Sequence, residues 1–108
     1  MAQEIFSKEE LSRYSRHLII PEFNIEGQRK LKAAKVLVVG TGGLGAPLLQ
    51  YLAAAGVGTI GVLDFDVVED SNLQRQVLFS TSDIGKPKVQ AAKERLEGLN
   101  PYLSLIHI

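Results

Sequence analysis

The sequence predicts an α/β fold with a parallel sheet of βαβαβ order, preceded by N-terminal helices. An aliphatic run over residues 36–39 leads directly into the turn Gly40-x-Gly42-x-x-Gly45. An apolar, Ala-rich segment follows over residues 44–55, and a second aliphatic run then ends at Asp64. Strand, tight glycine turn, helix and second strand in this order are typical of one half of a Rossmann-like sheet.

The composition limits the classes of function that need to be considered. The chain has 108 residues, about one small domain, and its 12 basic and 12 acidic residues cancel. This balance gives no charge signal for nucleic acid or for an anionic membrane, and no stretch is apolar enough to cross a bilayer. The absence of cysteine excludes a disulfide framework, a Cys-based zinc site and a thiolate nucleophile within this chain. We expect a soluble, cytoplasmic protein.

Residues 1–34 are predicted to form a helical N-terminal segment. Ser7 and Glu10 have the spacing of a capping box, so a short helix should follow as far as Leu18. Pro21 ends this helix in a loop. A second, polar helix is predicted over residues 25–34.

Residues 35–108 are predicted to supply the strands and helices of the sheet. The strand at 35–39 has the unbroken apolar composition of a strand covered on both faces. Pro47 fits the first turn of the helix at 44–55, because the missing N–H costs little there. The remaining predicted elements are a strand at 59–63, a long polar connection at 67–85, a helix from Pro87 to Leu99 and a strand at 102–108.

This order accounts for only the first half of a doubly wound sheet. A three-stranded parallel sheet buries a modest core, and its strands need neighbours. We therefore interpret residues 35–108 as the first half of an ATP-binding Rossmann-like domain that is apparently truncated. The chain is expected to be a fragment of a larger protein or, second, a protomer that completes itself by association.

The glycine turn and Asp64 together predict a nucleotide site. Glycines allow the backbone to approach a phosphate, and the following helix offers free N–H groups to an anion. Asp64 stands at the distance expected for a carboxylate that binds ribose hydroxyls. The alternatives are a turn that only packs a helix on a sheet, and a carboxylate that only caps a loop. Asp66 is equally consistent with a metal contact or with a solvated loop.

The long connection favours ATP over NAD. It carries Asn72, Gln74, Arg75 and Gln76, and Lys88 follows at the start of the next helix. Such donors suit a triphosphate, whose charge must be neutralised and whose transfer must be stabilised. Considered alone, each residue has an alternative interpretation: Arg75 could pair with Glu69 or Asp70 on the surface, and Lys88 could be a solvated helix residue.

Several motifs resemble, in the same order, the N-terminal part of the ubiquitin-activating-enzyme-like adenylyltransferases of the MoeB/ThiF/HesA type. The resemblance covers nearly the whole chain from Leu11 to Pro101. Its motifs are Arg13-Tyr14-Ser15-Arg16-His17, Gly27-Gln28, Gly40-Thr41-Gly42-Gly43-Leu44-Gly45, Ala54-Ala55-Gly56-Val57-Gly58, Leu63-Asp64-Phe65-Asp66, Ser71-Asn72-Leu73-Gln74-Arg75-Gln76, Gly85-Lys86-Pro87-Lys88 and Leu99-Asn100-Pro101.

This resemblance implies an adenylyltransferase of molybdopterin or thiamine biosynthesis. In its reaction, ATP and the C-terminal Gly-Gly carboxylate of a ubiquitin-like sulfur-carrier protein give an acyl-adenylate and pyrophosphate. The implied catalytic residues are Arg75, Lys88 and Arg16, the last acting across a homodimer interface. Arg16 could instead be an exposed helix residue near Glu9 or Glu22. The implied nucleotide-binding residues are Gly40, Gly42, Gly43, Gly45, Asp64, Ser71, Asn72, Leu73, Gln74, Arg75 and Lys88.

Other parts of the family pattern have no counterpart in these 108 residues. The Mg²⁺ ligand, the groove for the carrier's tail and any zinc motif are expected outside this chain, so no metal ligand is assigned within it. Two further functions stay open: an NAD-binding domain of an oxidoreductase and a non-catalytic dimerisation module. Which carrier and pathway the protein serves is left undetermined by the sequence.

Overall fold

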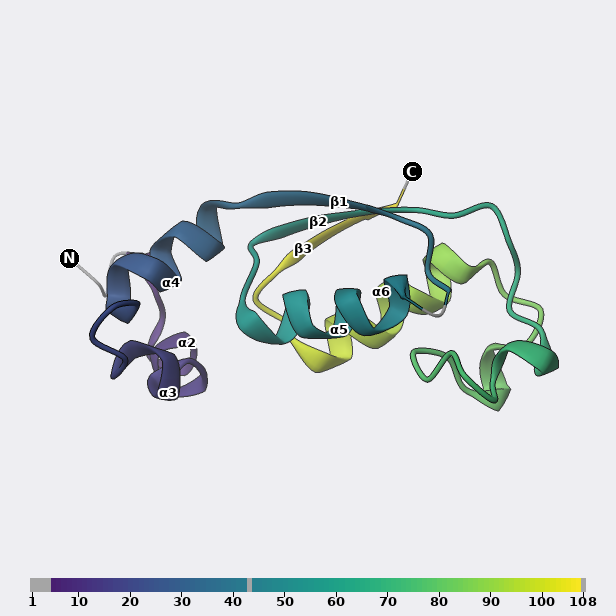
Figure 1. The fold of residues 1–108 in the computed structure, drawn as a ribbon, viewed down its shortest axis with the longest axis horizontal. Coiled ribbons are helices and arrows are strands. Elements are labelled where there is room, and N and C mark those ends of the chain that lie inside the picture. The colour runs from purple at the N-terminus through teal and green to yellow at the C-terminus, as the bar shows by residue number, and fades with distance from the viewer. Residues whose placement is uncertain (1–4, 43, 108) are drawn as a thin grey trace.

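The computed structural model describes residues 5–42 and 44–107 and confirms the α/β fold (Figure 1). A three-stranded sheet lies at one side, two long helices run beneath it, and short N-terminal helices gather at one end. Within the part of the chain that is described, no helix is long and apolar enough to span a lipid bilayer.

The sheet is parallel throughout, in the order β1-β2-β3. Strand β1 spans Lys35–Val39, β2 spans Thr59–Leu63 and β3 spans Ser104–His107. The first two have the predicted bounds. β3 begins two residues later than predicted, because the N–H of Tyr102 donates to the side chain of Asn100 in the preceding turn; Ile108 lies outside the described residues.

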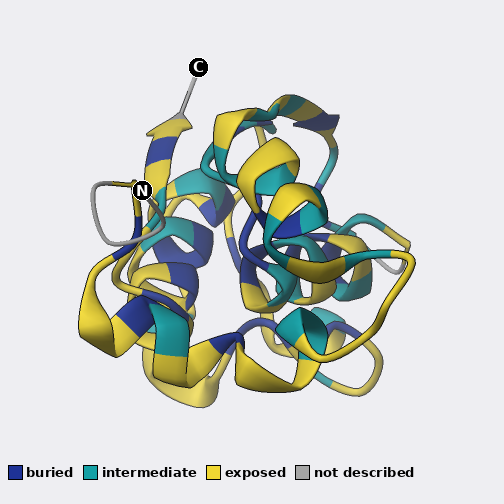
Figure 2. Cartoon of the chain, turned by 90° about the vertical axis from the view of Figure 1, so that its left-hand side faces the viewer, coloured by how far each residue is buried: buried dark blue, intermediate teal, exposed yellow. Residues whose placement is uncertain are grey.

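Two helices connect the strands and cover one face of the sheet. α5 spans Gly45–Ala55 and α6 spans Lys88–Leu99. Crossovers between parallel strands are right-handed, so two that advance in the same direction place both helices on the same face. The hydrophobic core lies between these two helices and the sheet, and Figure 2 shows the buried inner sides of the helices. The core contains Val38, Ala46, Leu49, Ala53, Ile60, Val62, Ala91, Ala92 and Leu96.

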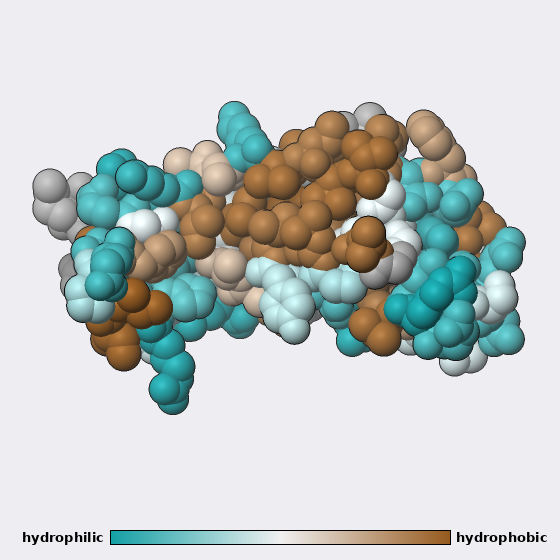
Figure 3. All heavy atoms as spheres, in the orientation of Figure 1, coloured by the Kyte–Doolittle hydropathy of each residue, from teal (hydrophilic) through white to brown (hydrophobic). Residues whose placement is uncertain are grey.

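Among the described residues, no helix covers the opposite face of the sheet. Leu37, Val39 and Ile106 are exposed, and Leu37 and Ile106 border a shallow apolar hollow of about 270 Å³. Figure 3 shows hydrophobic residues gathered across the middle of the molecule. The prediction that the strand at 35–39 is covered on both faces is therefore wrong for the described residues, because both crossover helices take the same side.

The N-terminal segment forms three short helices: α2 at Lys8–Arg13, α3 at Ser15–Leu18 and α4 at Asn24–Ala33. The capping box is confirmed, since Ser7 and Glu10 exchange backbone-to-side-chain hydrogen bonds of 3.1 Å each. The predicted single helix to Leu18 is wrong in one respect: Tyr14, with ψ of 10°, separates α2 from α3.

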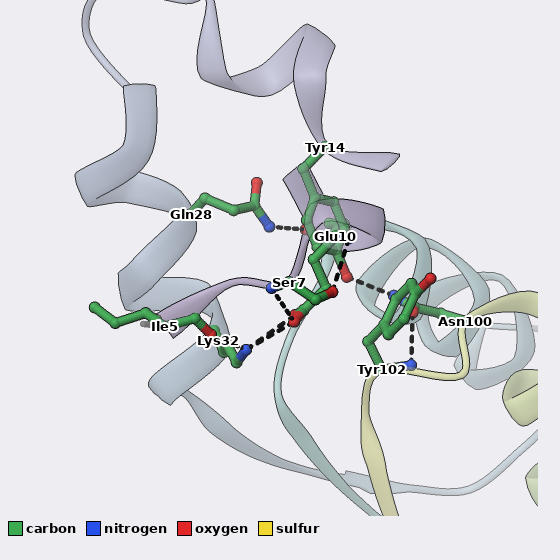
Figure 4. A network of polar contacts seen from close by, with 9 residues as sticks. Ile5, Ser7, Glu10, Tyr14, Gln28, Lys32, Asn100 and Tyr102 are labelled. Carbon is green, nitrogen blue, oxygen red and sulfur yellow. Dashed lines mark hydrogen bonds and ion pairs between the residues drawn. The ribbon is translucent and has the colours of Figure 1, made fainter. Parts of the chain in front are cut away.

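A network of buried polar groups fastens this segment to the sheet domain (Figure 4). Nδ2 of Asn100 donates to the hydroxyl of Tyr14 at 2.8 Å and to the carbonyl of Ala53 at 2.7 Å. Nε2 of Gln28 donates to the carbonyl of Ala55 at 2.8 Å. Because both carbonyls belong to the last turn of α5, the N-terminal helices are held at the end of α5 that lies away from the glycine turn.

The connection between β2 and α6 is ordered by two 3₁₀ turns, η1 at Asp70–Asn72 and η2 at Thr81–Asp83. It is closed at its base by a bridge between Val67 and Pro87. The helix predicted from Pro87 to Leu99 begins one residue later, at Lys88, and Pro87 is its N-cap.

Candidate functional site

The site is built where the first two parallel strands end side by side. Val39 and Leu63 are paired at the carboxyl ends of β1 and β2, and the N–H of Gly40 donates to the carbonyl of Leu63 at 2.7 Å. Crevices outside the carboxyl ends of parallel strands are the usual ligand sites of such sheets. The glycine turn after β1 and the acidic residue after β2 therefore meet at this edge.

Asp64 is bound directly to the glycine turn. Its Oδ2 accepts hydrogen bonds from the N–H of Thr41 at 2.8 Å and from the hydroxyl of Thr41 at 2.9 Å. Its Oδ1 accepts from the N–H of Asp66 at 2.8 Å. Partial burial by itself would raise the pKa of Asp64, but these hydrogen bonds and the positive charge of Lys88 outweigh it, so the pKa lies below its ordinary value. The carboxylate is therefore charged at neutral pH and retains free lone pairs.

Two glycines in the turn are required by its geometry. Gly40 has φ of +93°, a conformation that disfavours residues with a Cβ. A Cβ on Gly45 would lie 2.0 Å from the carbonyl oxygen of Gly40, so only glycine lets α5 start this close to β1. Gly42 has ordinary space around it, and Gly43 lies outside the described residues.

The N-terminus of α5 points out of this turn without a side-chain cap. The N–H of Ala46 is satisfied by the carbonyl of Gly42 at 2.9 Å, and Pro47 has no N–H. The first turn of an uncapped helix keeps donors and a positive dipole end that favour an anion. This end of α5 is suited to a phosphate group.

A cavity of about 350 Å³ lies at the long connection, among residues that follow Asp64 and at the start of α6. It is lined by Phe65, Asp66, Val67, Glu69, Asn72 and Lys88. The structure thus brings together Asn72 and Lys88, two predicted nucleotide-binding residues from separate segments. Asn72 is oriented by the N–H of Glu69, which donates to its Oδ1 at 2.9 Å.

Lys88 is a buried cation in this cavity. Only 6% of the residue is exposed, and its Nζ lies 3.9 Å from Oδ2 of Asp66. The Asp66 side chain itself is 76% exposed, so this pair leaves the charge of Lys88 only partly compensated. The alternative that Lys88 is a solvated helix residue is therefore wrong. A buried ammonium group that faces a cavity is suited to an anionic ligand.

The other predicted residues of the connection do not line this cavity. Arg75 is exposed, and its guanidinium donates to the carbonyl of Ser71 at 3.2 Å. Within residues 5–42 and 44–107 it forms no ion pair with Glu69 or Asp70. Gln74 is exposed and Leu73 packs against the core. These residues lie next to the cavity in sequence but present no group to it.

Arg16 lies at the far end of the molecule from the glycine turn. It belongs to α3, which Figure 1 places beside the start of the chain, whereas the turn lies at the opposite end of β1 and α5. Among the described side chains it pairs with neither Glu9 nor Glu22, the alternative considered for it. It is exposed to solvent.

Sequence reasoning missed Thr41, and it named Gln76 only as one of the donors of the long connection. Thr41 is fully buried and makes the contact that joins Asp64 to the turn. The pairing of parallel strand ends could have revealed it, because the residues after β1 and β2 must face one another. Gln76 is also buried, its Nε2 faces Gly42, and its Oε1 accepts no hydrogen bond from the described residues.

These residues fit a nucleoside triphosphate. The site offers a close-approach glycine turn, an uncapped helix N-terminus, an ionised carboxylate for hydroxyl groups and a buried ammonium group. In the described part of the chain, no three Asp, Glu or His side chains gather in a way that could hold a metal ion. The donors present are chemically suited to phosphate and hydroxyl groups.

Comparison with known proteins identifies the family to which the chain is similar. The profile of the ThiF family matches residues 14–108, which is most of the chain. The chain is 60% identical over 97 residues to the "Probable adenylyltransferase/sulfurtransferase MoeZ" of Mycobacterium tuberculosis. It is 58% identical over 98 residues to the "Sulfur carrier protein adenylyltransferase" of Thermus thermophilus.

Similarity extends to solved structures. The crystal structure of Escherichia coli MccB with ATP is 38% identical, has a TM-score of 0.83 and is matched over 94% of this chain. The chain spans a minor part of all these proteins: 25% of MoeZ, 36% of the Thermus protein and 31% of the MccB chain. The two sequence matches extend over 90% and 91% of this chain.

Proposed function

This chain belongs to the ThiF family, and from that premise we propose that it supplies the ATP-binding part of an adenylyltransferase that activates a ubiquitin-like sulfur-carrier protein. One observation carries the proposal: the carboxylate of Asp64 is tied to Thr41 of the glycine turn, beside a buried, partly compensated Lys88. The names of the relatives and the similarity to MccB with ATP support it.

Each group has a role in holding ATP. The glycine turn and the first N–H groups of α5 bind phosphate oxygens, and Asp64 accepts from the ribose hydroxyls. Lys88 contributes a fixed positive charge and Asn72 an amide to the phosphates. Arg75 joins them after its guanidinium leaves the carbonyl of Ser71, a change that costs one exposed hydrogen bond.

The reaction is the transfer of an adenylyl group. An oxygen of the carrier's C-terminal carboxylate attacks the α-phosphorus of ATP, a bond from oxygen to phosphorus forms, and the bond to pyrophosphate breaks. The carrier's carboxylate is the nucleophile and pyrophosphate leaves with the electron pair, so this step needs no nucleophile from the enzyme. Fixed positive charge and positioning are what such a transfer needs.

The remaining cofactors and partners belong to the same proposal. Mg²⁺ would accompany ATP and neutralise phosphate charge, with its protein ligand outside these 108 residues; zinc is proposed only there as well. The protein acts as a homodimer in the cytoplasm, and Arg16 of one copy contributes to the ATP site of the other. The position of Arg16 far from its own glycine turn supports this arrangement.

The test is a direct binding measurement followed by a turnover measurement. ATP with Mg²⁺ is titrated into the chain by calorimetry, with NADH as the competitor that a dinucleotide-binding domain would prefer. Pyrophosphate exchange into ATP is then measured with candidate carriers that end in Gly-Gly. We expect ATP binding that Asp64→Asn and Lys88→Met weaken and Lys86→Met leaves intact. Tight NADH binding without ATP binding would contradict the proposal.

A further inference from the structure

We propose that the carboxylate of Asp66 is the resident counter-ion of Lys88, which it holds in the cavity until a phosphate oxygen takes its place. Asp66 is thus a positioning residue that acts through Lys88 and sets how strongly the site binds phosphate. The inference rests on the proposed function, because it specifies which partner Lys88 exchanges when ATP binds. The sequence alone left Asp66 between a metal contact and a solvated loop.

The main chain of Asp66 lies between the two charged groups of the site. Its N–H donates to Oδ1 of Asp64 at 2.8 Å, and its carbonyl accepts from the N–H of Lys88 at 2.9 Å. The N–H of Val68 donates to the carbonyl of Lys86 at 2.9 Å and continues this pairing of the connection with the start of α6. Because these contacts use backbone groups of residue 66, a change of its side chain leaves them in place.

The side chain of Asp66 enters the same cavity as Lys88. Both residues line it, and Oδ2 of Asp66 lies 3.9 Å from Nζ of Lys88. In the described part of the chain, no other acidic side chain forms an ion pair with Lys88. Figure 1 shows the connection between β2 and α6 at the end of the molecule opposite the N-terminal helices, so the acidic residues of those helices are remote. Asp66 therefore supplies the countercharge.

Lys88 needs a countercharge because it is almost completely enclosed. Its side chain is only 7% exposed. An ammonium group withdrawn from water is strongly destabilised unless an opposite charge lies near it. The carboxylate of Asp66 reduces this penalty before a ligand binds.

The geometry of this pair favours exchange. At 3.9 Å the two atoms are beyond hydrogen-bond distance, so no hydrogen bond between them has to break. The Asp66 side chain is 76% exposed and can turn into solvent, where its charge stays hydrated. A phosphate oxygen can make a direct, charge-assisted hydrogen bond to the ammonium group. Lys88 thus gains a stronger partner without leaving the cavity.

A counter-ion and a metal ligand have opposite effects on ATP binding. A counter-ion competes with phosphate for Lys88, so its removal strengthens binding with or without Mg²⁺. Removal of a metal ligand weakens binding, and only when Mg²⁺ is present. A solvated loop residue has no effect beyond the general influence of its charge. The sign of the change and its dependence on Mg²⁺ therefore distinguish the three roles.

Calorimetry with ATP, in Mg²⁺ and in EDTA, measures this sign. Asp66→Asn should raise ATP affinity about two- to fivefold in both solutions, a modest gain because an exposed ion pair is weak. Asp66→Glu keeps a carboxylate and should restore the wild-type affinity. Asp70→Asn is the matched control, since Asp70 is an exposed acid of the same connection that does not line the cavity, and it should change affinity less. Weaker binding of Asp66→Asn in Mg²⁺ only, or an affinity equal to that of Asp70→Asn, would overturn the inference.

A double-mutant cycle in urea tests the pair without ATP. Asp66→Asn should lower the urea midpoint, because it leaves Lys88 buried without a countercharge. In the Lys88→Met background the same substitution should leave the midpoint unchanged. Equal shifts in both backgrounds would show that Asp66 does not act through Lys88 and would refute the counter-ion role.

The cycle also separates this inference from the proposed function. ATP binding by the wild-type chain with no coupling between the two residues would keep the function and refute the inference. Coupling with no ATP binding would refute the function and the exchange with phosphate, and would keep only the pairing of Asp66 with Lys88.

Discussion

Asp64 and Thr41 are joined by two hydrogen bonds to a single oxygen, 2.8 Å from the backbone N–H and 2.9 Å from the hydroxyl. This contact links the loop after β2 to the loop after β1. It fixes the glycine turn relative to the carboxylate that is proposed to bind ribose. The same side chain therefore supports both the fold and the site.

Replacing Asp64 by Asn should lower both the stability of the fold and the affinity of the site for ATP. The carboxylate accepts on both oxygens, and an amide has one acceptor oxygen and an NH₂ group that repels the remaining donor. We expect a loss of about 1 to 3 kcal/mol in the free energy of unfolding and at least a tenfold loss of ATP affinity. Urea denaturation and calorimetry measure the two effects.

Asp83→Asn is the matched control for that substitution. Asp83 accepts from the N–H and the hydroxyl of Ser80 at 2.8 and 3.0 Å, the same pattern of contacts, but in η2. It should lower stability and leave ATP affinity within twofold. An equal loss of ATP affinity in both variants would show that Asp64 acts only through folding.

The stability of the protein should depend on the ionisation of Asp64. Its pKa is lower in the folded chain than its ordinary value near 4, despite partial burial, because of hydrogen bonds from Asp66 and Thr41. A lowered pKa contributes stability above the unfolded pKa, and this contribution is lost as pH falls through the folded pKa. Urea titrations from pH 6 to about pH 3 should show this loss, and Asp64→Asn should show a shallower one. An unchanged slope in the variant would contradict the assignment.

Lys88 should be more important for binding than for stability. Its ammonium group is buried beside one exposed carboxylate, so desolvation offsets much of the attraction. Lys88→Met should leave the free energy of unfolding unchanged or raise it by up to about 1 kcal/mol, while ATP affinity falls at least tenfold. Lys86→Met is the control, because Lys86 is bound on the surface to Glu94 and Asp83. Destabilisation by several kcal/mol on Lys88→Met would show that the lysine is structural.

Replacement by alanine should change the stability of the protein in opposite directions at two helical glycines. In Gly45→Ala, the new Cβ meets the carbonyl oxygen of Gly40, so the start of α5 must move away from β1. We expect a loss of more than about 2 kcal/mol, together with weaker ATP binding. Gly98 in α6 has open space around it, and Gly98→Ala should raise stability by about 0.5 to 1 kcal/mol. Thermal unfolding of both variants tests the pair.

The attachment of the N-terminal helices depends on Asn100. This buried side chain donates to Tyr14 and Ala53 and accepts from the N–H of Tyr102. Asn100→Leu removes these three buried or partly buried hydrogen bonds and should cost about 2 to 4 kcal/mol. Tyr14→Phe removes only one acceptor and should cost about 1 kcal/mol. Equal losses would show that the tyrosine hydroxyl has further partners.

The sequence predicted secondary structure well where the structure of a segment depends on residues close to it in the chain. The β-branched runs, the capping box at Ser7 and the glycine turn predicted β1, β2, α5 and the start of α2 within about one residue, because each depends on near neighbours. The break at Tyr14 was not predictable in this way. Tyr14 is buried against distant residues such as Asn100, and that contact lies 86 positions away in the chain.

The sequence by itself determined the α/β class, the order of strands and helices, and the presence of a glycine turn followed by an acidic residue. These are properties of local spacing, which hydrophobic periodicity and backbone geometry encode directly. Only the tertiary structure decided that Thr41 meets Asp64, that Lys88 is buried and Arg75 is not, and that one face of the sheet is bare. Strand pairing and right-handed crossovers impose those relationships on residues far apart in the chain, so no local window contains them.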